Sequence, residues 1–360
     1  MSLAVMHQIQ AAGKIYNVVD DFNSVYRALI TGSVTDEILG SFTAPGLGIH
    51  VDRSDMATKT AGNGLFAVSG YSEQSFPNLN LVSYVVNLVV SAPRFRDQKL
   101  AVPIPVNATF PVLAVSVALR RKPVAVQGRV VADTATRPPI AGAKIVTVDD
   151  PATPPTLHTI ALRSPISLPH SAGTTVREIA MAVFGSAQLT SDALSRSQNL
   201  NLSSRAGLAP NSVLQLGDAG KTRTEYGIVD SLAPGAGAGQ VFLRQPLNGN
   251  FVAGIATTVN FLNAGAAGST ATLSRDADQG DGILLASQLV DNTLEIDPGG
   301  TAVEYRDAGA LTDAAGYYAI YGVGRSAELY FQASHSGFTT QTRGWSVDYD
   351  NAVNIFDFRL

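Results

Sequence analysis

The sequence predicts an all-β protein with two β-sandwiches, the second interrupted by a mainly-β inserted domain. Short runs rich in β-branched residues, such as 85–90 and 126–131, are bounded by Gly, Pro, Asp and Asn, as strands are. The chain is 45% hydrophobic and only 15% charged, with 33 Gly and 18 Pro, which suits short strands joined by tight turns. The same strand pattern also occurs twice, and this repetition indicates two similar modules.

Residues 1–28 precede the first copy of the pattern, and we expect them to form an N-terminal arm. Their apolar residues are irregularly spaced. Asp and Ser at 20–24 are good helix caps, so a short helix is predicted to run through Ala28. The arm is expected to pack on a partner or on the first sandwich.

The first copy predicts a sandwich over 29–121. Its apolar segments are 30–36, 47–51, 65–68, 84–92 and 115–119. The segment at 65–68 follows a turn that ends at Gly64, where a residue without Cβ can adopt a positive φ. Lys122-Pro123 is then a short, stiff linker.

The second copy predicts a sandwich made from 124–147 and 308–360. Its apolar segments are 126–131, 140–146, 317–320, 328–333 and 355–360. Gly316 ends the turn that precedes 317–320 and is a second predicted positive-φ glycine. A loop tolerates a long insertion when its two ends lie close together in space.

The inserted domain is predicted over 148–307. Val176, Ile179 and Val183 recur at helical spacing and predict a helix over 174–184. Strands are expected at 241–243, 282–285 and 293–296. The Gly/Ala stretches at 234–239 and 264–269 are expected to be exposed loops or close backbone contacts.

The second copy contains a characteristic set of glycine, aspartate and apolar residues, namely Gly128, Val130, Asp133, Pro139, Ile140, Gly142, Ala143, Thr312, Asp313, Gly316, Tyr318, Ile320, Gly337, Phe338, Phe358 and Leu360. On these residues it resembles the carboxypeptidase regulatory-like domain, which implies an Ig/transthyretin-like β-sandwich. The first copy departs from this pattern, with Asn63 in place of the aspartate and Arg94 in place of a glycine. In that family the module is an accessory without catalytic residues, so the resemblance implies an architecture and leaves the function open.

One acidic loop has the residue types of a calcium site. Asp276, Asp278 and Asp281 are interleaved with glycine, and clustered carboxylates suit a hard cation. Their spacing differs by one residue from the EF-hand order, and the closing Glu is absent. A solvated acidic turn is the preferred interpretation, and no cofactor is predicted.

Other catalytic patterns are weak. The chain has no cysteine, and its five histidines are not spaced as metal ligands or as a triad. The glycine-rich stretch 235–239 lacks the βαβ context of a phosphate loop. Two carboxylate pairs, Glu295 with Asp297 and Glu304 with Asp307, are of the kind that glycosidases use, but acids at strand ends are common. We therefore predict that the protein is not an enzyme.

Charge and segment lengths limit the partners. A net charge of −4 gives no electrostatic basis for binding nucleic acid, and no apolar run is long enough for a membrane helix. The N-terminus lacks the basic and apolar regions of a secretory signal. We expect assembly in the cytoplasm and, where the protein leaves the cell, release as a particle.

These features favour a structural subunit of a large assembly, such as a component of a phage-tail-like particle or contractile injection system (baseplate, tail or appendage). Its expected partners are other subunits or further copies of itself. An alternative is a carbohydrate-binding or adhesive surface module, since aromatic residues are concentrated over 317–349. A second alternative is a hydrolase with its site in the inserted domain.

Overall fold

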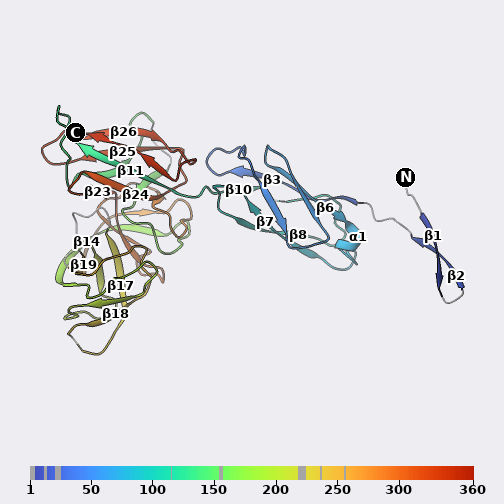
Figure 1. Ribbon diagram of the computed structural model, residues 1–360, viewed down its shortest axis with the longest axis horizontal. Coiled ribbons are helices and arrows are strands. Elements are labelled where there is room, and N and C mark those ends of the chain that lie inside the picture. Colours follow the sequence, from blue (N-terminus) through green and yellow to red (C-terminus); the bar gives the residue numbers. More distant parts are fainter. Residues whose placement is uncertain are drawn as a thin grey trace. The chain divides into compact units, whose positions relative to one another are not determined.

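The computed structural model describes residues 5–11, 14–20, 26–114, 116–153, 157–217, 224–235, 237–254 and 257–360 (Figure 1). Within these ranges the secondary structure is almost entirely β, and the only helix is the one-turn α1 (Ser72–Ser75). None of the described segments is a helix long and apolar enough to cross a membrane. The chain forms two compact units, Met1–Lys122 and Pro123–Leu360. The predicted all-β fold class is confirmed.

The N-terminal segment contains a hairpin of β1 (Val5–Ala11) and β2 (Lys14–Asp20). The short helix predicted through Ala28 is wrong at its end, because Ala28 lies in β3 and pairs with Ser69 of β6. Burial of Leu29 and Ile30 in the sandwich favours this strand over an isolated helical turn. The proposed cap residues 21–24 lie outside the described residues.

The first unit contains a two-sheet sandwich. One sheet has the order β10 (Val117–Leu119), β3 (Tyr26–Asp36), β6 (Leu65–Tyr71), β5 (Ala57–Thr60), with β9 (Val112–Leu113) also paired to β3. The other has the order β4 (Gly48–Val51), β7 (Tyr84–Ser91), β8 (Gln98–Ile104). Alternate residues of β3 and β7 are buried in the core between the sheets, as expected for strands with one face covered.

The second sandwich has a similar arrangement, except that β23 pairs with β12 whereas β5 of the first sandwich pairs with β6. One sheet contains β24 (Tyr317–Val323), β11 (Val124–Val131), β27 (Val353–Ile355) and β28 (Phe358–Arg359). The other has the order β23 (Ala310–Leu311), β12 (Lys144–Val148), β25 (Glu328–Ser334), β26 (Gln341–Ser346). Like β3, the central strand β11 pairs antiparallel with one neighbour and parallel with two short strands at its other edge. The two central strands therefore have the same pattern of neighbours.

The chain between β12 and β23 forms an eight-stranded sheet. Its order is β15 (Asn199–Leu202), β18 (Gly239–Leu243), β17 (Glu225–Leu232), β16 (Val213–Leu216), β19 (Thr258–Thr272), β14 (Thr175–Gln188), β21 (Thr293–Ile296), β22 (Glu304–Asp307). A separate pair is formed by β13 (His158–Ala161) and β20 (Ile283–Ala286). The two longest strands, β14 and β19, run side by side (Figure 1).

The helix predicted over 174–184 is wrong, because this segment is strand β14. Val176, Ile179 and Val183 are β-branched and fit a strand as well as a helix face. The long antiparallel pairing with β19 decides between the two. The Gly/Ala stretch 264–269, expected as a loop or a close contact, lies in β19 as exposed strand.

The inserted region is itself duplicated. Strands β13–β17, here copy A, and β18–β22, here copy B, are equivalent in order and pairing. The long strand of each copy, β14 in copy A and β19 in copy B, pairs with the long strand of the other copy. The first strand of each copy pairs with the third strand of the other copy, so that β13 pairs with β20 and β18 pairs with β15. Likewise, β16 adds to β19 as β21 adds to β14. Each half of the inserted region is therefore completed by strands from both copies.

Candidate functional site

The inserted region joins the second sandwich at two places, and the first lies between β12 and β13. The hydroxyl of Thr147 donates to the carbonyl of Thr159 at 2.6 Å and accepts from the amide of Ala161 at 2.8 Å. Beside it, Lys144 Nζ lies 2.7 Å from a carboxylate oxygen of Asp291. These contacts tie the inserted region directly to the sandwich sheet.

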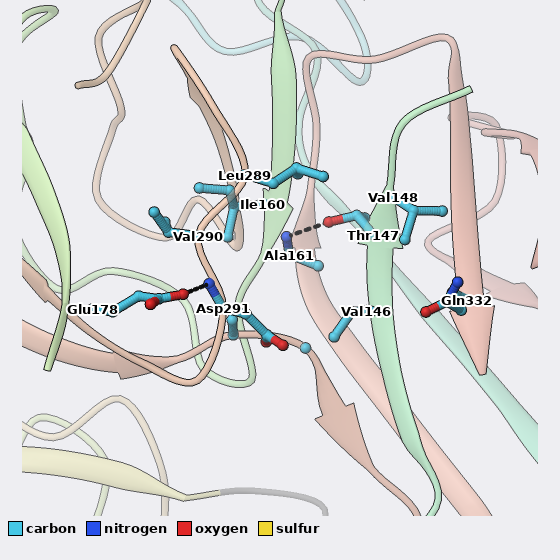
Figure 2. A pocket seen from close by; sticks show the side chains of 12 residues that line it. Val146, Thr147, Val148, Ile160, Ala161, Glu178, Leu289, Val290, Asp291 and Gln332 are labelled. Atoms are coloured by element: carbon cyan, nitrogen blue, oxygen red, sulfur yellow. Dashed lines mark hydrogen bonds between the residues drawn. The ribbon is translucent and has the colours of Figure 1, made fainter. Parts of the chain in front are cut away.

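A small cavity of about 230 Å³ lies at this first joint (Figure 2). Val146, Ile160 and Val290 contribute to its apolar wall, and Glu178 lies at its edge. The Glu178 carboxylate accepts the amide of Asp291 at 2.6 Å, drawn as a dashed line in Figure 2. The Glu178 carboxylate and the Asp291 amide at this cavity are therefore hydrogen-bonded to each other.

The second joint is made by the acidic loop. Arg325, in the turn after β24, places Nε 3.3 Å from Oδ2 of Asp281 and Nη2 3.3 Å from Oδ2 of Asp278. Its guanidinium also donates to the main-chain carbonyl of Asp276. The Arg325 and Asp281 side chains are only 7% and 6% exposed, so this ion pair is largely shielded from water.

The copy A loop equivalent to the acidic loop clarifies the role of its first aspartate. Asp276 accepts the amide of Ala172 at 2.8 Å, and Asp192 in copy A accepts the amide of Ala253 at the same distance. This first carboxylate therefore braces a turn that both copies contain. Such a role needs no cation.

The other two aspartates have no acidic counterpart. The turn in which the amide of Asp281 bonds the carbonyl of Asp278 at 2.9 Å recurs at Ser197 and Leu194, at 3.0 Å. The turn thus forms without carboxylates in copy A. In copy B, Asp281 Oδ2 accepts the amide of Asp278 at 2.9 Å, and both carboxylates also bind Arg325. In the described part of the chain, no group of three or more His, Asp or Glu side chains is arranged to hold a metal ion.

A buried cluster is formed by the titratable and charged side chains of His170, Glu304 and Arg306. His170 Nε2 lies 2.7 Å from Glu304 Oε1, Arg306 Nη2 lies 2.5 Å from Glu304 Oε2, and all three side chains are at most 1% exposed. The amide of Ser167 also donates to Glu304 at 2.9 Å. Burial alone would raise the pKa of Glu304, but Arg306 and these hydrogen bonds hold it below its usual range. Because these three side chains are shielded from solvent, we interpret the cluster, here the buried lock, as a structural element.

Of the two carboxylate pairs considered in the sequence, Glu304 with Asp307 is not assembled as an acid–base pair. Glu304 and Asp307 are an odd number of residues apart on β22, so their side chains point to opposite faces. Glu295 accepts hydrogen bonds from Arg177 at 2.7 Å and from Tyr305 at 3.1 Å. Burial, together with the Glu295 carboxylate, raises the pKa of Tyr305 to about 12. Glu295 and Glu304 are therefore held by fixed partners.

The two turn glycines lie at the ends of equivalent turns, with φ of +83° at Gly64 and +78° at Gly316. These values lie in the left-handed region that favours glycine. The position equivalent to Asp313 is Ala61. The amide of Asp313 donates to the carbonyl of Tyr317 at 2.9 Å, and the amide of Ala61 donates to the carbonyl of Leu65 at 2.8 Å. Asn63 therefore does not occupy the aspartate position. Its side chain instead accepts the amide of Leu65 at 3.4 Å, whereas Asp313 accepts that of Tyr317 at 2.9 Å.

Each sandwich exposes an apolar side chain on an edge strand, and these two edge strands are equivalent in position. Leu113 in β9 is 79% exposed and pairs with Thr31, and Ile355 in β27 is 68% exposed and pairs with the equivalent Gln127. Among the described strands, β9 pairs only with β3 and β27 only with β11. These two strands, here the apolar edges, form the surface feature that the two sandwiches share.

Comparison with known proteins identifies no family. No protein-family model matches the chain, and neither does any curated protein. Among solved structures, the crystal structure of BcpA, the major pilin subunit of Bacillus cereus, aligns with a TM-score of 0.19 and 7% sequence identity. The alignment covers 92% of this chain and 98% of the pilin. A TM-score this low does not indicate a shared fold.

Proposed function

We propose that the protein is a non-enzymatic structural subunit of a large assembly and that it assembles through its apolar edges. The observation that carries this proposal is the equivalent exposure of Leu113 and Ile355 on edge strands of the two sandwiches. Exposed sheet edges are usually protected by charge, proline or a covering segment, because they add strands from other chains. Two apolar edges in one chain provide two points of attachment.

The two joints of the second unit support a mechanical role. Arg325 with the acidic loop, and Thr147 with β13, fix the inserted region to the second sandwich. The buried lock around Glu304 further connects elements of the inserted region. The acidic and histidine side chains that suggested chemistry are thus used to hold the unit together.

The class of assembly that fits best is a phage-tail-like particle or contractile injection system, in which this chain would serve as a baseplate, tail or appendage component. Tandem sandwiches whose central strands have the same pattern of neighbours, one of them carrying a large inserted region, support this choice. The resemblance of the second sandwich to the carboxypeptidase regulatory-like module is consistent with an accessory architecture. We propose that the subunit assembles in the cytoplasm with other subunits or with itself.

Sedimentation velocity of the full chain over a concentration series tests assembly through the edges. The double variant Leu113→Lys/Ile355→Lys is expected to abolish concentration-dependent association, because each lysine places charge on an edge. Leu81→Lys is the matched control, since Leu81 is 75% exposed and lies outside any strand. Association that persists in the double variant, or a parent chain that stays monomeric alone and with its co-purified proteins, would refute the proposal.

A second candidate function is glycan binding on the outer face of β24. Tyr317 and Tyr321 are 53% and 37% exposed, and strand periodicity places them on the same face. Aromatic faces of this kind can stack on sugars. A glycan array probed with the parent and with Tyr317→Ala tests this function. Selective binding that the variant loses supports it, and an array without signal rejects it.

A further inference from the structure

Strand β27, at the edge of the second sandwich, directs the main chain of two of its residues away from the sheet. Ile355 lies opposite Gln127 in the register of β27 with β11, and the amide of the next residue, Phe356, donates to the Gln127 carbonyl at 2.8 Å. In a parallel ladder, residues that bond the neighbouring strand alternate with residues whose N–H and C=O point away from it. Val353 and Ile355 therefore turn both of their main-chain groups outward.

The side chains of the same two residues are also the exposed ones. Val353 is 45% exposed and Ile355 is 68% exposed, whereas Asn354 between them is buried. Among the described strands, β27 pairs only with β11. Outward hydrogen-bonding groups and exposed apolar side chains thus occur at the same two positions, which is the kind of edge that adds a further strand.

The spacing of these two residues makes β27 complementary to itself. When two copies of β27 pair antiparallel around a two-fold axis at Asn354, Val353 of each copy lies opposite Ile355 of the other. Each of these two pairs can then exchange both of its N–H···O bonds. The apolar side chains of each pair also meet on one face of the sheet, where cross-strand contacts are stabilising. The sheet that contains β24, β11 and β27 would continue into the second copy.

The equivalent edge of the first sandwich does not have this property. The amide of Ala114 donates to the carbonyl of Thr31 at 2.7 Å, so the outward positions on this edge are Leu113 and Pro111. Proline has no N–H to donate, and at a sheet edge it limits strand addition. Among the described residues of this edge, only Leu113 offers both an outward N–H and an outward C=O. A second β27 therefore matches β27 better than β9 does.

We propose that two copies of the protein form a two-fold symmetric dimer by antiparallel pairing of β27 with β27, with Val353 opposite Ile355. This inference rests on the proposed function, because it assigns a partner to one of the two apolar edges. A two-fold contact uses the same surface on both copies and closes on itself. The β27 edge therefore joins the copies in pairs, and the β9 edge is left for contacts with other subunits.

Cysteine cross-linking of the full chain tests this register, because the chain has no cysteine of its own. In the proposed pairing the Cα atoms of residues 353 and 355 in different copies lie about 5.5 Å apart, which suits a disulfide. A mixture of Val353→Cys and Ile355→Cys chains, treated with oxidised glutathione, should form a cross-linked dimer of the two variants. Each variant alone should lose most of this product, since its two cysteines lie diagonally across the axis, roughly 7–8 Å apart.

Leu113→Cys is the matched control, because Leu113 is an exposed apolar residue on the equivalent edge. Mixed with Ile355→Cys, it should give no cross-linked dimer. A disulfide between these two variants in place of the one within β27 would overturn the self-pairing and indicate a head-to-tail contact. Sedimentation velocity gives an independent measurement, in which Ile355→Lys should lose the dimer and Leu113→Lys should keep it.

The outcomes separate this inference from the proposed function. Association that is lost in Leu113→Lys/Ile355→Lys, without cross-linking between Val353→Cys and Ile355→Cys, would refute the self-pairing alone. A parent chain that is monomeric by itself but associates with its co-purified proteins would do the same. A parent chain that stays monomeric in both cases would refute the proposed function as well.

Discussion

Gly64 and Gly316 occupy the same position in the two sandwiches. The carbonyl of Gly64 accepts the amide of Val34 at 2.8 Å, and the carbonyl of Gly316 accepts the amide of Val130 at 2.8 Å. A Cβ atom at Gly64 would lie 2.3 Å from the Val34 carbonyl oxygen, and one at Gly316 would lie 2.6 Å from that of Val130. In each sandwich the central strand therefore hydrogen-bonds to a turn whose last residue must be glycine.

Replacing either glycine should destabilise its own unit. Gly64→Val and Gly316→Val combine a positive φ with a clash against main chain, which a side-chain movement cannot relieve. A loss of about 3 kcal/mol or more in the free energy of unfolding is expected. Chemical denaturation of each variant measures it.

Gly62→Val is the control for Gly64. It lies in the same turn, and a Cβ there would meet no atom within 4 Å. Its unfolding free energy should change by less than about 1 kcal/mol. Equal losses at Gly62 and Gly64 would show that the turn tolerates neither residue and that the backbone argument for Gly64 is wrong.

Glu304→Gln should destabilise the second unit by about 3 kcal/mol, because it leaves Arg306 buried without a full counter-charge. Denaturant titration of the parent and the variant measures the loss. Glu295→Gln is a useful comparison, since its partner Arg177 is 36% exposed and a smaller loss is expected. Equal losses in the two variants would contradict a special role for the buried lock.

Glu304 should also make the free energy of unfolding depend on pH. The pKa of Glu304 is lower in the folded protein than its ordinary value of 4.5, so the ionised form stabilises the fold. This contribution is complete above pH 4.5 and is lost as the pH falls through the folded pKa. Glu304→Gln lacks the titrating group, so its unfolding free energy should fall less steeply below pH 4.5 than that of the parent. Parallel pH profiles would refute the assignment.

Calcium should not stabilise the protein through the acidic loop. Asp278 and Asp281 bind Arg325, and Asp276 braces the turn, so the carboxylates already have partners. Melting temperatures with calcium and with a chelator should be equal for the parent. Arg325→Met should lower the melting temperature and increase amide exchange over 276–282, because it opens the second joint. A calcium-dependent rise in the parent would contradict this role.

The sequence was informative where structure depends on local pattern. The all-β class follows from short β-branched segments between turn residues, and these signals lie within a few residues of each other. Gly316 could be identified as a special position because the turn at 310–316 surrounds it in sequence. The prediction of a helix over 174–184 was wrong because the structure of this segment does not depend on local pattern. Strand β14 is fixed by β19, which lies far along the chain, and no local pattern reports that pairing.

The contacts of the candidate sites could not be predicted from spacing. Arg325 reaches the acidic loop from the other side of the insertion boundary, and Arg163 meets Thr224 and Asp307 from distant strands. The duplication, however, left a readable signal. Leu-Arg at 162–163 recurs at 243–244, and Thr-Thr-Val at 174–176 recurs at 257–259. These repeated segments align Arg163 with Arg244, so the sequence does carry the correspondence between the two copies.

Electron microscopy of the protein purified at native levels, without an affinity tag, tests the central claim most directly. We predict that the chain is found within a tail, tube, baseplate or appendage, with β9 or β27 adjacent to a neighbouring subunit. A dispersed monomer that co-purifies with no particle protein would contradict a structural role in a large assembly.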